Sequence, residues 1–120
     1  MNYFTEQELA CSCCGTNHFD DEFLALLNKM REQCGFPFPV SSGYRCPNHP
    51  IEAKKKSPGA HTTGQAVDIL AYGARAQELV RCALNNNIKR IGIAQKGDIK
   101  TRFIHLDVAQ GLPSPAFWSY

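Results

Sequence analysis

The sequence lacks both a long hydrophobic run and a strong excess of charge. No stretch approaches the roughly 20 consecutive apolar residues of a membrane-spanning helix, so we expect no membrane insertion. Charged residues make up 20% of the chain and the net charge is +2, which argues against the concentrated basic surface of a nucleic-acid-binding protein. We interpret the run Lys54-Lys55-Lys56 as a solvated loop, with contact to an anionic polymer as the alternative.

The features of a secretory signal are also missing. The first ten residues contain Glu6 and Glu8 where a signal has basic residues, and no apolar segment follows them. We therefore expect synthesis in the cytoplasm without export by that route. The 120 residues suit a single domain spanning 1–120, which we expect to be a monomer.

Cysteine, in contrast, is plentiful for so short a chain. In a protein that is not exported by a signal we expect the thiols to be mostly reduced. Cys11, Cys13, Cys14 and His18 are close enough in sequence to form a second, structural zinc site, but Cys-x-Cys-Cys differs from the usual Cys-x2-Cys spacing. Buried or idle thiols are the favoured interpretation. The six cysteines are Cys11, Cys13, Cys14, Cys34, Cys46 and Cys82.

Helix signals come first along the chain. Thr5 and Glu8 match a capping box, which predicts a short helix from about residue 6. Asp20 is the expected N-cap of a second helix, which Gly35 ends. The apolar residues of this helix recur at helical spacing: Phe23, Leu24, Leu27 and Met30. Residues 36–50 are rich in proline and predict turns and short extended pieces, and residues 52–60 predict a flexible surface loop.

The second half alternates between strand and helix patterns. We predict a strand over 66–70, a helix over 74–84, and an antiparallel hairpin whose strands span 88–94 and 101–108. The tail, 111–120, is interrupted by proline and is predicted to be irregular. This order favours an α+β fold over a doubly wound parallel sheet.

Ionisable side chains share one face of the last strand. Side chains alternate along a strand, so Phe103, His105 and Asp107 point away from the apolar residues between them. Asp68 likewise faces away from its apolar neighbours on the strand over 66–70. His61 lies seven residues before Asp68, and Gly64 between them allows the bend that would let both reach one ion.

Two imidazoles and one carboxylate form a known catalytic zinc set that leaves a fourth position for water, and such a set performs hydrolysis. By pattern alone, a His with a nearby Asp is more often structural or at the surface, so the residues leave both interpretations open.

Four segments carry a resemblance: FTEQELACSCCG (4–15), SGYRCPNH (42–49), SPGAHTTGQAVDI (57–69) and FIHLDV (103–108). Together they resemble the zinc D-alanyl-D-alanine carboxypeptidase family, which is related in fold to the hedgehog signalling domain, and the first resembles the start of its small phage and bacterial members. The resemblance implies a small antiparallel sheet with flanking helices and one Zn²⁺ bound by His61, Asp68 and His105.

The resemblance also gives roles to other residues. Arg45 matches the arginine that holds a carboxylate of the substrate, a task that suits its planar fork. Asp107 is the first candidate for the general base, with orientation of a liganding His as the alternative. His49 and Glu52 are the next candidates, and His18 is expected to have no catalytic role.

The sequence departs from the family pattern in two places. Gly59 stands where members often have a Ser, with Ser57 two positions earlier. Arg102 stands three positions before the last ligand, where several members carry an acidic or histidine base.

The implied activity is that of a zinc metallopeptidase that cleaves stem or cross-link peptides of peptidoglycan, as carboxypeptidase or endopeptidase, in an endolysin-like role in a phage or prophage. One alternative is a zinc-stabilised cell-wall-binding or virion domain without a competent base, which Arg102 favours. Another is a redox or thiol-metal protein built on the six cysteines.

Overall fold

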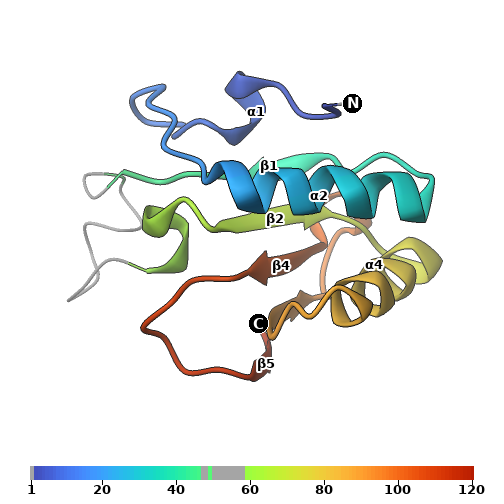
Figure 1. The fold of residues 1–120 in the computed structure, drawn as a ribbon. Coiled ribbons are helices and arrows are strands. Elements are labelled where there is room, and N and C mark those ends of the chain that lie inside the picture. Colours follow the sequence, from blue (N-terminus) through green and yellow to red (C-terminus); the bar gives the residue numbers. More distant parts are fainter. Residues whose placement is uncertain (1, 47–48, 50–58) are drawn as a thin grey trace.

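A computed structural model describes residues 2–46, 49 and 59–120. The chain forms one five-stranded sheet, in the order β1-β2-β4-β3-β5, with helices packed against it (Figure 1). The strands are β1 (Val40–Ser42), β2 (Ala66–Leu70), β3 (Arg90–Ala94), β4 (Phe103–Asp107) and β5 (Ala116–Ser119). The helices are α1 (Glu6–Leu9), α2 (Asp21–Cys34) and α4 (Gly73–Asn85), with 3-10 turns η1 (Ala60–Thr63) and η2 (Ile99–Thr101). The α+β prediction is confirmed.

Both predicted helix starts in the first third are confirmed by their caps. Thr5 accepts a hydrogen bond from the Glu8 backbone, and the Glu8 side chain accepts one from the Thr5 backbone, which completes the capping box of α1. The Asp20 side chain caps α2, and Gly35 ends that helix in the left-handed conformation. The starts of α1 and α2 and the end of α2 therefore lie where the sequence predicted them.

The predicted hairpin is confirmed, because β3 and β4 pair antiparallel, but two expectations about the sheet are wrong. The tail is not irregular throughout: after Pro115 it forms β5, which pairs with β3 in parallel. The sheet is therefore mixed and not purely antiparallel. Pro113 and Pro115 have no N–H to donate, so pairing starts only where the Ala116 N–H bonds to the Lys89 carbonyl, leaving a strand too short to show a clear alternation.

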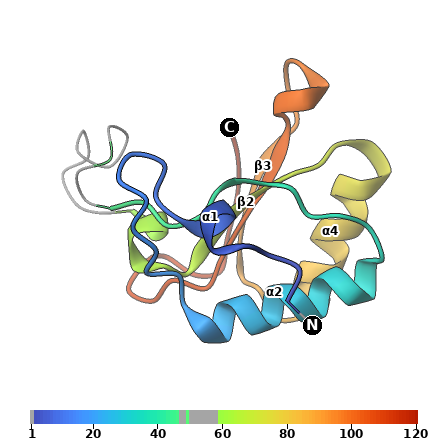
Figure 2. The same ribbon diagram turned by 90° about the horizontal axis from the view of Figure 1, so that it is seen from above.

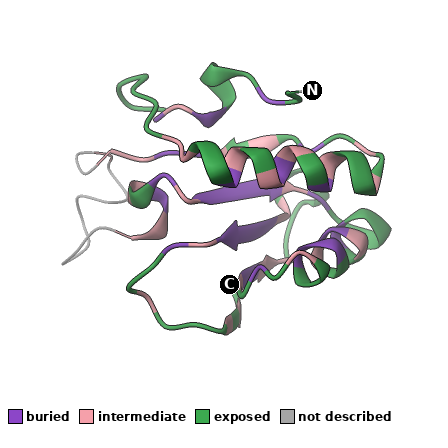
Figure 3. Ribbon diagram, viewed as in Figure 1, coloured by how far each residue is buried: buried purple, intermediate pink, exposed green. Residues whose placement is uncertain are grey.

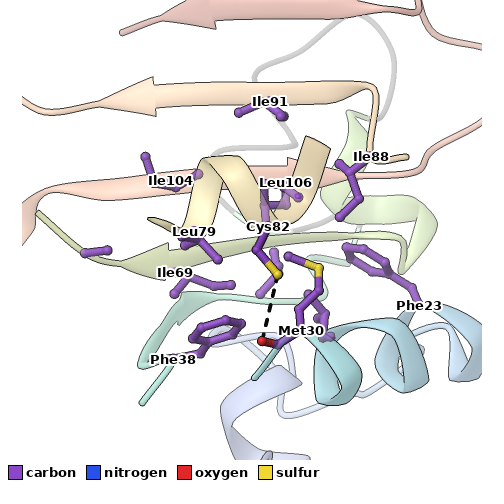
Figure 4. Close-up of a cluster of buried hydrophobic side chains, with 14 of the residues drawn as sticks. Phe23, Met30, Phe38, Ile69, Leu79, Cys82, Ile88, Ile91, Ile104 and Leu106 are labelled. Atoms are coloured by element: carbon purple, nitrogen blue, oxygen red, sulfur yellow. Dashed lines mark hydrogen bonds between the residues drawn. The ribbon is translucent and has the colours of Figure 1, made fainter. Parts of the chain in front are cut away.

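The hydrophobic core lies between the sheet and helices α2 and α4, which cover the same face (Figure 2). Ile69, Ile104 and Leu106 point from the strands toward Met30 and Leu79 of the helices (Figure 4). Strands β2 and β4 are buried along most of their length (Figure 3). The other face of these central strands is therefore shielded too, although it carries the polar side chains Asp68, His105 and Asp107.

Several predictions lie outside the described residues: the Lys54-Lys55-Lys56 run, Glu52, Ser57 and most of the loop predicted over 52–60. Within the ranges that are described, no helix has the length and apolar character needed to cross a membrane.

Candidate metal centre

The polar face of the sheet carries one row of aligned residues. Asp68 on β2 lies opposite His105 on β4, and His105 lies opposite Gly92 on β3. Gly92 in turn lies opposite Trp118 on β5. A Cβ atom on Gly92 would lie 2.6 Å from the Trp118 ring nitrogen, so only glycine lets this ring lie against the sheet. The centroid of the Trp118 ring is 5.3 Å from that of His105.

His61 reaches the same row from the 3-10 turn η1, which precedes β2. Gly64 ends this turn with a φ of +76°, so the bend expected between His61 and Asp68 is present. A side chain at Gly64 would also overlap the backbone carbonyl of His18, which closes tightly against it. The position of His61 thus depends on the absence of a side chain at Gly64.

The donor atoms of three side chains converge. Nε2 of His61 lies 3.3 Å from Oδ1 of Asp68, and Nδ1 of His105 lies 2.8 Å from the same oxygen. All three donor atoms lie within 4.8 Å of one another, and all three residues are buried. Ligands of a tetrahedral zinc ion are about 3.3 Å apart, given metal-ligand distances of about 2.0–2.1 Å. The His61–Asp68 separation fits this value, and the His105–Asp68 separation would have to widen slightly.

The second nitrogen of each imidazole is already engaged. Nδ1 of His61 donates to the carbonyl oxygen of Gly43 at 2.7 Å, and Nε2 of His105 donates to Asp107 at 2.6 Å, because carbonyl and carboxylate oxygens can only accept. In neutral rings these bonds leave the lone pairs of the other nitrogens directed at Asp68. Three electron-pair donors that face one another repel unless a proton or a metal cation lies between them, and bonds of this kind orient metal-binding histidines.

The electrostatics of this group keep Asp68 charged. Burial by itself raises the pKa of Asp68, but hydrogen bonds and charge from His105 and His61 outweigh it and hold that pKa well below its usual range. Burial lowers the pKa of His105, whereas its hydrogen bonds to Asp107 and Asp68 raise it above the ordinary value. The cluster therefore offers an ionised carboxylate to a cation.

Asp107 is fully buried and makes three contacts. Besides Nε2 of His105, it accepts hydrogen bonds from Nε of Arg90 at 2.7 Å and from the backbone N–H of Ala109 at 3.2 Å. Arg90 lies directly opposite Asp107 across the β3·β4 pair, donates to the carbonyl of Pro113 and lies over the Trp118 ring. Asp107 is thus the centre of a network that ties the tail to the metal centre.

Arg45 lies at the open side of the cluster. Its Nη2 is 3.7 Å from Oδ2 of Asp68, and its backbone N–H donates to the carbonyl of His61 at 3.2 Å. A cavity of roughly 540 Å³ opens here, large enough for a small ligand. Its walls combine basic and apolar residues with the three donors: Arg45, Gly59, Ala60, His61, Asp68, Arg90, Phe103, His105, Leu112, Trp118 and Tyr120.

Comparison with known proteins assigns this arrangement to a family. The model of the Peptidase M15 family matches residues 2–107. The chain belongs to this family. M15 peptidases are zinc-dependent, so membership supports a peptidase that binds a metal, and the convergent His61, Asp68 and His105 fit such an ion by their chemistry. No curated protein and no solved structure matches, so the hedgehog-like fold stays a prediction.

The other residues of this M15 member that were considered for a catalytic role make their contacts away from the three donors. Arg102, which stands where a base was expected, donates from Nε and Nη2 to the Gly97 carbonyl at the hairpin turn. Nε2 of His49 forms a hydrogen bond of 2.9 Å with the Ser12 hydroxyl. His18 is exposed, with its ring 5.2 Å from that of Tyr44. None of these contacts is made with the three donors.

Sequence reasoning missed three residues. Arg90 and Trp118 join the network around His105, and Cys46 joins the cysteines of the turn after α1. Arg90 could have been found, because alternation along the predicted hairpin puts it on the same face as Asp107. Trp118 and Cys46 gave no such signal: one belongs to an unpredicted strand, and the other is distant in sequence from its partners.

Proposed function

We propose that this chain is a zinc metallopeptidase that hydrolyses stem or cross-link peptides of bacterial peptidoglycan. The observation that carries the proposal is the orientation of the two imidazoles: each has one nitrogen engaged by a protein acceptor, and the other directed at Asp68. A zinc ion bound there would supply an activated water and polarise the scissile carbonyl.

Arg45 would hold a carboxylate of the substrate in the cavity beside the donors. Its guanidinium borders Asp68, whose charge it balances only in part at 3.7 Å. The planar fork can donate two hydrogen bonds to a further carboxylate in a bidentate manner. Arg90 also lines the cavity, but it is paired with Asp107. The stem peptides of peptidoglycan carry free carboxylates, which supports this class of substrate.

Asp107 is better suited to orient His105 than to act as a base. Its two oxygens are used by His105, Arg90 and the Ala109 N–H, and it has no exposed surface. A general base must come within hydrogen-bonding reach of the water that attacks. Holding the correct tautomer and ring orientation of His105 is the role that these contacts support.

A zinc-stabilised cell-wall-binding domain is the second candidate. Among the described residues that line the cavity, Asp68 is the single carboxylate, and Arg102 is bonded to the hairpin turn. A domain of this kind would keep the metal and bind the wall without cleaving it. The resemblance of residues 4–15 to small phage and bacterial members supports a cell-wall role. For the peptidase, that role would be endolysin-like.

Digestion of purified peptidoglycan separates the two candidates. The peptidase should release new amino termini or shortened stem peptides, detected by mass spectrometry of the muropeptides, and a chelator should abolish the release. His61→Ala should be inactive, whereas His18→Ala, which changes an exposed histidine, should retain activity. Sedimentation with the wall without any new product would favour the binding domain and refute the peptidase.

A further inference from the structure

Four cysteine sulfurs converge at the end of the molecule where the turn after α1 meets the segment following β1. Cys11, Cys13 and Cys14 lie in that turn, and Cys46 approaches it from the other segment. The sulfurs of Cys11, Cys13 and Cys46 are 3.3–3.5 Å apart, and all four lie within 4.8 Å of one another. These separations are far longer than the bond of about 2.05 Å in a disulfide.

Backbone contacts around the sulfurs bring the two segments together. The Tyr44 N–H donates to the Leu9 carbonyl at 2.8 Å. Gly43 fits directly against Leu9, because a Cβ atom there would lie 2.6 Å from the Leu9 carbonyl oxygen. The turn itself is closed by the Cys11 N–H, which donates to the Thr16 carbonyl at 2.7 Å. These backbone contacts hold the two cysteine-bearing segments side by side, so the sulfurs are brought together by the fold.

We propose that these four cysteines bind a structural zinc ion, separate from the His-Asp-His centre. Four thiolates in a tetrahedral arrangement form a closed zinc site, in which sulfurs lie about 3.8 Å apart for Zn–S bonds of about 2.3 Å. The separations among the sulfurs of Cys11, Cys13 and Cys46 need only a small expansion to reach this value, and Cys14 lies within 4.8 Å of all three. The Cys46 N–H already donates to Cys11 Sγ at 3.3 Å, as a backbone amide does to a thiolate ligand.

The other two cysteines, which lie outside the cluster, differ from it in their burial and contacts. Cys82 belongs to the hydrophobic core and approaches the Met30 carbonyl at 4.0 Å (Figure 4). Cys34 is half-buried at the end of α2. In contrast, Cys13 and Cys14 are exposed, so apolar packing does not account for their presence in the cluster.

The ion would stabilise the backbone beside the proposed substrate site. Cys46 directly follows Arg45, whose N–H is bonded to the His61 carbonyl, and Gly43 accepts the hydrogen bond from the His61 ring. Anchoring Cys46 therefore limits the movement of the segment between these contacts. This consequence for substrate binding rests on the proposed function, whereas the metal site does not.

Metal analysis of the full chain tests the proposal. Elemental analysis of protein purified anaerobically and dialysed against zinc should find two zinc ions per chain. His61→Ala should retain one, Cys13→Ser should retain one, and the control Cys34→Ser should retain both. If the His-Asp-His centre fails to bind, the wild type will hold one zinc ion that His61→Ala keeps and Cys13→Ser loses, so the two proposals fail separately.

Cobalt substitution gives a second measurement, whose central result comes from the wild-type protein. The wild type with Co²⁺ should show the intense thiolate-to-cobalt charge-transfer absorption of a four-sulfur site, and His61→Ala should keep it. Hydrogen exchange at the Tyr44 and Arg45 amides should speed up in Cys13→Ser. Absence of the charge-transfer band, a disulfide among the four cysteines under these conditions, or iron in place of zinc would overturn the proposal.

Discussion

The carboxylate of Asp107 accepts a hydrogen bond of 2.6 Å from Nε2 of His105, and this bond determines which nitrogen of His105 faces Asp68. The two residues lie two positions apart on β4 and so share a face. Arg90, directly opposite on β3, balances the charge of the buried carboxylate. The candidate metal centre is therefore a network of contacts across three strands and not only a set of three possible ligands.

Replacing Asp107 by Asn should weaken zinc binding. The amide keeps one accepting oxygen and has a donating NH2 group in place of the other, so either His105 or Arg90 loses its acceptor. We therefore expect a tenfold to hundredfold loss in zinc affinity. Competition with a chromophoric chelator measures this loss, with the exposed Asp21→Asn as the control. Unchanged zinc affinity together with lost turnover would instead show that Asp107 acts as the base.

Replacing Arg45 by Met should raise KM and leave the bound zinc unchanged. Hydrogen bonds to charged groups are worth about 1.5–3 kcal/mol, so KM should rise tenfold to hundredfold for a peptide with a free carboxylate. Steady-state kinetics on that peptide and on its amidated form provide the test. An equal effect on both forms would contradict recognition of a carboxylate, and the exposed Arg81→Ala serves as control.

Gly64→Ala should destabilise the fold more than Gly35→Ala. Both glycines end a helical turn at nearly the same φ, +76° and +74°, but only at Gly64 would a side chain overlap the His18 backbone. The left-handed conformation costs roughly 1–2 kcal/mol in either variant, and the clash should add about 1–3 kcal/mol at Gly64. Urea unfolding measures the free energy of unfolding of both variants. Equal losses would mean that η1 can shift away from the His18 backbone without destabilising the fold.

The emission of Trp118 should report the metal. It is the one tryptophan of the chain, and its ring lies 5.3 Å from that of His105. Zinc added to metal-free protein should change the emission because Nδ1 of His105 would bind the ion in place of its direct contact with Asp68. His61→Ala should lose most of this response, whereas Cys13→Ser should keep it. A response that disappears in the cysteine variant alone would place the affected metal elsewhere.

Local chemistry was enough to predict much of the fold. The capping box of Thr5 and Glu8, the cap at Asp20 and the alternation in β4 each depend on neighbours in sequence, and each is confirmed. The shared face of His105 and Asp107 follows from the period of a strand alone. Alternation over 66–70 and the bend at Gly64 made Asp68 and His61 candidate partners, the family resemblance assigned them as ligands with His105, and the structure brings these donors together.

The sequence by itself determined the helices, the central strands, their order along the chain and the candidate donors Asp68, His105 and Asp107 on these strands. Only the tertiary structure decided which nitrogen of His105 faces Asp68, that Arg90 and Trp118 lie beside the His105–Asp107 pair, and that Cys46 meets the cysteines of the first turn. Those relationships depend on strand register and on backbone contacts such as Tyr44 to Leu9. Contacts between residues distant in sequence leave no periodic pattern along the chain, because each is set by the packing of whole elements.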